Sequence, residues 1–147
     1  MKIITLDFET YYDRAYSLSK LTTEEYIRDE QFEVIGVSVQ EDDSSVSSNT
    51  WFSGTEKETQ EFLEQFDWEN SLTVAHNAMF DMAILSWRFD IKPARIADTL
   101  SMARAIHGTQ VGGSLKALTE YYGIGKKGTE VLNALGKHRT DFSEEEL

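Results

Sequence analysis

Two carboxylates lie one residue apart near the N-terminus, in the stretch LDFET at residues 6–10. Because side chains alternate along a strand, Asp7 and Glu9 are expected on one face and Phe8 on the other. Like charges at this spacing repel each other, and a divalent cation between them would compensate. An isolated D-x-E is more often a pair of solvated acids at an exposed strand end, so this motif needs support from elsewhere in the chain.

A third carboxylate follows an apolar segment in the stretch AHNAMFDMAIL at residues 75–85. Asn77 stands at the expected N-cap of a helix, and Asp81 falls in the first turns of that helix. The neighbours of Asp81 are apolar, whereas a surface acid usually has polar neighbours. The alternative is an aspartate that simply stabilises a helix N-terminus through the helix dipole.

Composition restricts the chemistry that is available. The chain has 147 residues, enough for one domain with a substantial core, and it contains no cysteine. Disulfides, thiolate metal sites and cysteine nucleophiles are therefore excluded, and any metal must be held by oxygen or imidazole ligands. The sequence has neither an apolar run of about 18 residues nor an apolar block at its start, so we expect a cytoplasmic protein without a membrane segment.

The net charge of -12 argues against a nucleic-acid partner, but the charges are unevenly distributed. Residues 91–139 contain eight lysines and arginines against three acidic residues. This asymmetry is typical of a protein in which one face approaches phosphates and another holds divalent metals. A solvated basic surface without a partner explains it equally well.

The hydrophobic pattern predicts an α/β fold: one domain over residues 1–147, with a mixed sheet and flanking helices. Capping signals indicate helices after Thr22, Thr55, Asn77 and Asp98, and glycines 123 and 136 end two further helices. The expected strands cover residues 2–8, 32–40, 46–52, 71–76 and the start of 95–100, and the two late helices cover 115–122 and 129–135.

Taken together, the stretches LDFET, HNAMFD and ADTL resemble the 3′-5′ exonuclease domains of the DEDD superfamily, most closely the proofreading domains at the front of phage DNA polymerases of the family A type. The resemblance implies a ribonuclease H-like fold and a site with two Mg²⁺ or Mn²⁺ ions. Asp7 would bridge both ions, Glu9 would bind one, and Asp81 would complete part of the site. Thr10, Asn77 and Phe80 match positions expected to bind the terminal nucleotide.

The implied reaction is hydrolysis of the terminal phosphodiester at single-stranded or frayed DNA 3′ ends. A polymerase domain in the same or a partner chain is the implied partner. The same chemistry on RNA is a close alternative, because the sequence has no feature that reads a 2′-hydroxyl.

The family pattern also requires a fourth aspartate on a late helix, next to a tyrosine or histidine, and the sequence lacks this element. Asp98 and Asp141 are the two acids that could replace it. In the final stretch DFSEEEL, Ser143 and Glu146 have capping-box spacing, so we expect the parent protein to continue into a further helix. The non-enzymatic alternative is an incomplete exonuclease fold that serves as a nucleic-acid-binding module.

Three other signals carry less weight. The stretch GIGKKG lies outside any βαβ context, so we interpret it as a basic loop in which Lys126 and Lys127 contact DNA phosphates. His76 is expected to pack rather than act as a general base. Tyr11 and Tyr12 could stack on an unpaired 3′ base or fill the edge of the fold.

Overall fold

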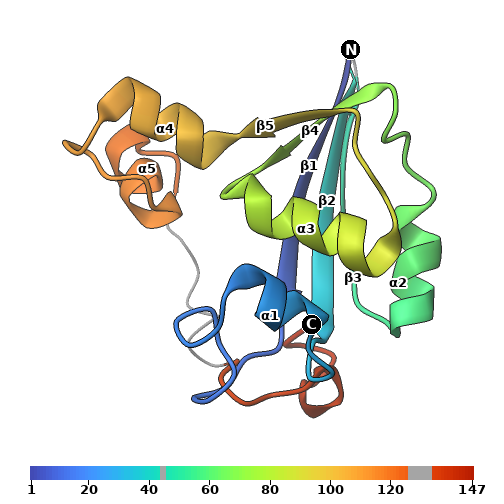
Figure 1. The fold of residues 1–147 in the computed structure, drawn as a ribbon. Coiled ribbons are helices and arrows are strands. Elements are labelled where there is room, and N and C mark those ends of the chain that lie inside the picture. Colours follow the sequence, from blue (N-terminus) through green and yellow to red (C-terminus); the bar gives the residue numbers. More distant parts are fainter. Residues whose placement is uncertain (44–45, 126–133) are drawn as a thin grey trace.

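The computed structural model describes residues 1–43, 46–125 and 134–147. Its centre is a five-stranded sheet in the order β3-β2-β1-β4-β5 (Figure 1). Strands β1, β2 and β3 pair antiparallel, whereas β4 and β5 extend the sheet in parallel with β1. The strand bounds are β1 Lys2–Thr10, β2 Val34–Asp43, β3 Val46–Phe52, β4 Ser71–Ala75 and β5 Arg95–Asp98. The predicted mixed sheet is thus confirmed, with its hairpin of β2 and β3.

Strand β1 is longer than β4, its parallel neighbour, and continues beyond it. Its pairing with β4 runs only from Lys2 to Thr5, while its antiparallel pairing with β2 continues to Thr10. The β1–β2 register shifts between Glu9 and Thr10. The last residues of β1 therefore leave the β4 side of the strand open to side chains from other elements.

Three helices cover one face of the sheet: α1 Thr23–Arg28, α2 Glu56–Leu63 and α3 Ala78–Phe89. Alternate β1 residues Ile4, Leu6 and Phe8 are buried beneath them and join one hydrophobic core. On the opposite face of β1, Thr5 and Asp7 are exposed. The period of two expected for a strand thus separates the core residues from the first carboxylate.

The starts of the first two helices follow the predicted capping boxes. Thr22 accepts from the Glu25 backbone N–H, and the Glu25 side chain accepts from the Thr22 backbone. Thr55 and Glu58 repeat this arrangement at α2. Each box satisfies backbone donors that a helix N-terminus leaves unpaired.

Helix α3 departs from the prediction in two respects. Asn77 occupies its N-cap, but in the left-handed region (φ 61°, ψ 57°) and without a hydrogen bond from its side chain to the helix. The spacing of apolar residues in the sequence predicts Trp87 on the apolar face of this helix, but Trp87 is 40% exposed, whereas Asp81, Leu85 and Phe89 are buried. The helix turns this side inward because Ile84, Leu85 and Phe89 pack into the hydrophobic core, and Asp81 is buried with them.

Helices α4 Thr99–His107 and α5 Leu115–Tyr122 form a hairpin, residues 99–122, that projects beyond the edge strand β5 (Figure 1). Asp98 caps α4 as predicted and accepts from Leu100 N at 2.9 Å. The spacing of Met102, Ala103 and Ile106 in the sequence predicts an apolar stripe on α4, but Met102 is 52% and Ile106 is 69% exposed. The periodicity predicted the helix correctly, but no described element covers this face.

The C-terminal segment packs against the end of β1 that carries the carboxylates. The Gly136 N–H donates to the Tyr12 carbonyl at 2.8 Å, and a short 3-10 helix, η1, spans Arg139–Asp141. The predicted helix at 129–135 falls largely outside the described residues. At the end, Glu146 accepts from Ser143 N at 3.0 Å, as half of the predicted box, within a turn. Within the described ranges, every helix is too short or too polar to cross a membrane.

Candidate active site at the open end of β1

Asp7 and Glu9 lie in the part of β1 that extends beyond its pairing with β4. Asp7 is exposed and pairs across the sheet with Ser38, and Glu9 is half-buried and pairs with Gly36. The Trp51 indole lies so close over Gly36 that a Cβ atom at this position would stand only 2.2 Å from Trp51 Cζ2. Residues that face each other across a strand pair share a face, so the indole borders the position of Glu9.

The third carboxylate reaches the same part of β1 from helix α3. Asp81 is only 3% exposed, and its Oδ1 accepts from the Phe8 backbone N–H at 3.0 Å. Burial is the largest cause that raises the pKa of Asp81 from 3.8 to about 7, and the bond from Phe8 opposes this rise. The negative charges of Asp7 and Glu9 raise the pKa further. Asp7 and Glu9 thus lie close enough to Asp81 for their negative charges to act on it.

This donor set fits a divalent cation in its chemistry. A buried carboxylate beside two others is destabilised in its charged form, and a hard cation with oxygen ligands relieves both the burial and the repulsion. As they stand, however, no three His, Asp or Glu side chains of residues 1–43, 46–125 and 134–147 are gathered tightly enough to hold a metal ion. The oxygens fit the ion, and the side chains need to turn toward a common point to bind it.

Asn77 and Asp98 fix the junction between β4 and α3. The Asn77 backbone N–H donates to Asp98 Oδ1 at 2.9 Å, while the Asn77 side chain is exposed. Desolvation acts to raise the pKa of Asp98, but hydrogen bonds from Leu100, Ala78, Ser101 and Asn77 together lower it. Asp98 is therefore occupied in tying α3 to α4, which argues against its service as a fourth metal ligand.

Thr10 and Phe80, both predicted to bind the nucleotide, meet the same buried tyrosine. Thr10 Oγ1 lies 2.8 Å from the Tyr26 hydroxyl, and the Phe80 ring lies 6.0 Å from the Tyr26 ring. Both predicted residues are half-buried. The structure thus brings Thr10 and Phe80 together at the end of β1 through a residue of helix α1.

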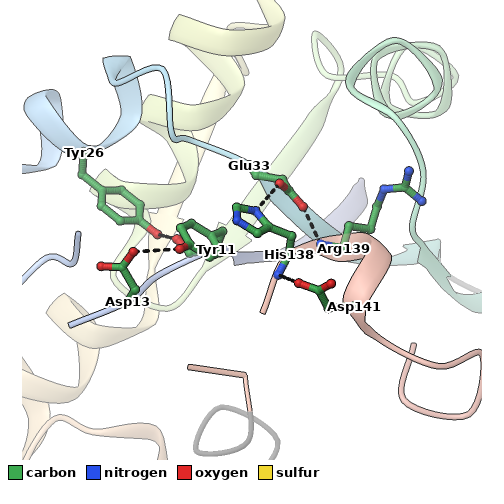
Figure 2. Close-up of polar contacts among 7 residues, drawn as sticks. All are labelled: Tyr11, Asp13, Tyr26, Glu33, His138, Arg139 and Asp141. Atoms are coloured by element: carbon green, nitrogen blue, oxygen red, sulfur yellow. Dashed lines mark hydrogen bonds and ion pairs between the residues drawn. The ribbon is translucent and has the colours of Figure 1, made fainter. Parts of the chain in front are cut away.

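The C-terminal segment covers Tyr11 (Figure 2). The His138 ring stacks on the Tyr11 ring at a centroid distance of 4.0 Å and an interplanar angle of 7°, and His138 Nδ1 lies 2.9 Å from Glu33. Asp141 accepts from the His138 backbone N–H at 2.9 Å and so caps η1. Of the two alternatives for Tyr11, the structure favours filling the edge of the fold. Asp141 is used locally, as Asp98 is.

His76 packs as predicted. One ring nitrogen, Nδ1, lies 2.9 Å from Thr99 Oγ1, and the other, Nε2, lies 2.8 Å from the Gly113 carbonyl. Because a carbonyl can only accept, Nε2 carries the hydrogen in this contact. With both nitrogens engaged, His76 anchors the loop before α5 to the end of β4.

Sequence reasoning missed two residues at this site, Trp51 and Tyr26. Trp51 stands alone in the polar stretch SSNTW, which was a signal that its ring has a specific place. Tyr26 follows a capping box on a short helix, and nothing local indicated that its hydroxyl reaches β1. Lys126 and Lys127 lie outside the described residues, so their contact with phosphates stays a prediction.

The sheet order and the carboxylates at the open end of β1 define the class: an α/β, ribonuclease H-like fold. The chain belongs to the 3′-5′ exonuclease family, which residues 2–132 match. Among solved structures it is similar to Brucella melitensis NrnC with bound Mg²⁺, at a TM-score of 0.60 and 12% identity. That likeness, which shows the fold alone, covers 86% of this chain and 56% of NrnC. No curated protein matches the chain.

Proposed function

We propose that this protein is a metal-dependent 3′-5′ exonuclease that removes nucleotides from the 3′ ends of DNA. The observation that carries the proposal is the carboxylate of Asp81, held at Phe8 N in a chain of the 3′-5′ exonuclease family, with a pKa that is raised mainly by burial and further by Asp7 and Glu9. A carboxylate destabilised in this way is typical of a functional site, because the arrangement costs stability that a ligand can restore.

Asp7, Glu9 and Asp81 would hold Mg²⁺ or Mn²⁺ through their oxygens. The chemistry that such an ion supplies is neutralisation of the phosphate charge and activation of the attacking water. The fixed position of Asp81 against Phe8 N keeps one ligand oriented before any ion arrives. The more exposed Asp7 is accessible to an approaching phosphate.

The remaining predicted residues would bind the terminal nucleotide. Thr10 follows Glu9 in the chain and is half-buried, and Asn77 is exposed at the start of α3. Phe80, three residues after Asn77, offers a half-buried ring and contacts Tyr26, as Thr10 does. The proposed substrate is single-stranded or frayed DNA, because the terminal nucleotide must be unpaired to reach the carboxylates. Lys126 and Lys127 are proposed to contact phosphates further along the strand.

The biological setting that we propose is proofreading in the cytoplasm, beside a polymerase domain in the same or a partner chain, as in phage replication. The second candidate function is an inactive exonuclease fold that binds nucleic acid. It is favoured by one observation: Asp98 and Asp141 are each committed to local hydrogen bonds, which leaves three carboxylates for the site.

The test is degradation of 5′-labelled single-stranded DNA in Mg²⁺ or Mn²⁺, with a matched RNA strand in parallel. We expect a ladder of 3′-shortened DNA and, for Asp7→Asn, a loss of at least about 100-fold in rate, because a metal ligand contributes several kcal/mol to the transition state. Asp42→Asn is the matched control, since Asp42 pairs with Ile3 at the other end of the β1–β2 ladder.

Three results would count against the proposal in different ways. Equal activity of Asp7→Asn and the wild type would exclude the carboxylate site. Faster degradation of RNA would change the substrate. Saturable Mn²⁺ binding, lost in Asp7→Asn, together with no ladder from the folded protein would support the inactive binding module instead.

A further inference from the structure

The face of the sheet that carries the carboxylates also carries a large exposed ring, that of Trp51. Asp7 pairs with Ser38 of β2, and Ser38 pairs in turn with Trp51 of β3, so these three residues form one row across the sheet. Residues paired in this way point to the same face. That face is opposite the one that α1, α2 and α3 cover (Figure 1). Trp51 is 41% exposed, and Asp7 is exposed in the same row.

The indole of Trp51 leans along the sheet toward Glu9. Gly36 lies directly opposite Glu9 on β2, two residues before Ser38. A Cβ atom at position 36 would stand 2.2 Å from Cζ2 and 2.4 Å from Cη2 of the indole, so the ring occupies the space that a side chain would need. Side chains directly opposite each other in an antiparallel pair are about 5 Å apart at Cβ. The missing side chain of Gly36 therefore lets the indole reach the space beside Glu9.

The core does not account for the position of this ring. Phe52, the next residue, takes the opposite face of β3, where it stacks on Phe62 at a centroid distance of 4.6 Å. Trp51 instead follows the polar stretch SSNT on β3, an edge strand of the sheet, and keeps part of its surface accessible. Exposed aromatic rings of this kind are the surfaces on which unpaired nucleobases stack. An exposed ring also contributes less to stability than a core ring, so the fold should tolerate its replacement.

We propose that Trp51 is a substrate-binding residue whose exposed indole stacks on an unpaired base near the 3′ end of the strand. Gly36 is its positioning residue, because it leaves the room that the ring fills beside Glu9. The ligand in this statement rests on the proposed function, whereas the placement of the indole does not. Every nucleobase has a π face, so the contact accepts all four bases and does not distinguish DNA from RNA.

The experiment removes the ring, displaces it, or removes a comparable ring elsewhere. Trp51→Leu removes the π face, and Gly36→Ala pushes the indole away from Glu9 without removing it. Trp87→Leu is the matched control, because Trp87 is 40% exposed but lies on α3 under the guanidinium of Arg28. Binding is measured by anisotropy in Ca²⁺, with thermal melting to verify the fold and a gel to verify intact DNA. The probes are 5′-fluorescent single strands that are complete or lack one base at one of the last three positions.

In the wild type and in Trp87→Leu, we expect the loss of one of these bases to weaken binding by roughly 5- to 150-fold, the range for one stacked base. Trp51→Leu and Gly36→Ala should bind the complete strand as weakly as the wild type binds the strand without that base. They should also be insensitive to its removal. Trp51→Phe should keep part of the effect, because a smaller ring still offers a π face.

The outcomes separate this proposal from the proposed function. A base effect that persists in Trp51→Leu, or that is lost equally in Trp87→Leu, would overturn the role of Trp51. A ladder of 3′-shortened DNA from the same protein in Mg²⁺ would then retain the proposed function. A full base effect in Gly36→Ala would refute the role of Gly36. A folded wild type that neither binds nor degrades any strand would refute the proposed function, and the base as a ligand of Trp51 with it.

Discussion

The carboxylate end of the sheet and the α4–α5 hairpin are built in opposite ways. Around β1, buried side chains from α1 and α3 form hydrogen bonds with the strand or with the residue that follows it, as Asp81 and Tyr26 do. In the hairpin, Ala103 is the buried residue of α4, and α5 has none among its residues Leu115–Tyr122. Among the described residues, buried contacts therefore surround the proposed site, whereas the hairpin has few of them.

Hydrogen bonds at the start of α4 and just before α5 attach the hairpin to the rest of the protein, which is called the body below. Asp98 bonds the starts of both α3 and α4, and His76 bonds Thr99 and the Gly113 carbonyl. Its own helices are joined at the far end, where His107 Nε2 lies 2.6 Å from the Tyr122 hydroxyl. A few hydrogen bonds at one end orient a unit without burying its faces, so we expect the hairpin to open at a lower free energy than the sheet.

The largest difference in stability should come from replacing one isoleucine by alanine in each region. Ile84 of α3 is fully buried, and Ile106 of α4 is 69% exposed. Ile84→Ala should lower the free energy of unfolding by about 2–5 kcal/mol because it leaves a cavity, and Ile106→Ala should change it by less than about 0.5 kcal/mol. Urea denaturation measures both. Similar losses of unfolding free energy would mean that Ile106 is also packed in solution, so that the two regions do not differ in this way.

The second effect is a pH dependence of stability that arises from the buried Asp81. The folded protein holds a proton on Asp81 up to about pH 7, whereas the unfolded chain loses it near pH 4. Stability should therefore fall as pH rises from about 4 to 7, by at most about 4 kcal/mol from this group, and then level off.

The measurement is the free energy of unfolding of metal-free wild type and Asp81→Asn across that window. The variant keeps an acceptor for Phe8 N but has no charge to bury, so its curve should lack this fall, and it should be the more stable protein at pH 7. Asp42→Asn serves as the control for the loss of one negative charge. Parallel curves for wild type and Asp81→Asn would contradict the buried, charge-strained carboxylate.

The smallest effect concerns the attachment of the hairpin. Asp98→Ala removes the cap of α4 and the partner of Asn77 N, which should cost about 1–2 kcal/mol. Amide exchange should rise at the starts of both α3 and α4. Ser114→Ala, which removes the cap of α5 alone, should raise exchange in α5 and leave α3 unchanged. A response of α3 to both variants would show that the hairpin is coupled to the body along its whole length.

Local signals account for what could be predicted from the sequence. The capping boxes at Thr22 and Thr55 and the alternation along β1 depend on neighbours within a few residues, and each was confirmed. Their physical basis is short-range: one helical turn for the cap, and the period of two for the strand. The mixed sheet follows from the order of these elements.

What could not be predicted depends on contacts between distant segments. The left-handed Asn77 donates its backbone N–H to Asp98, which lies 21 residues further along the chain, and Tyr26 reaches Tyr11 from another element. The exposure of Met102 and Ile106 depends on what covers α4, a property that periodicity does not contain. For the site, Asp7, Glu9 and Asp81 were predicted from motifs, and their approach to one another is visible only in the fold.

The placement of Trp51 over Gly36 gives this protein an internal optical probe. The indole borders the position of Glu9. Indole emission responds to nearby charge, so its intensity should track the ionisation and occupancy of the carboxylates beside it. Trp68 is buried, and its Nε1 donates to the Leu63 carbonyl. Trp87 of α3 lies under the guanidinium of Arg28 from α1, so neither of these two tryptophans borders the site. With those two replaced by phenylalanine, the remaining fluorescence would report the state of the carboxylates without any added label.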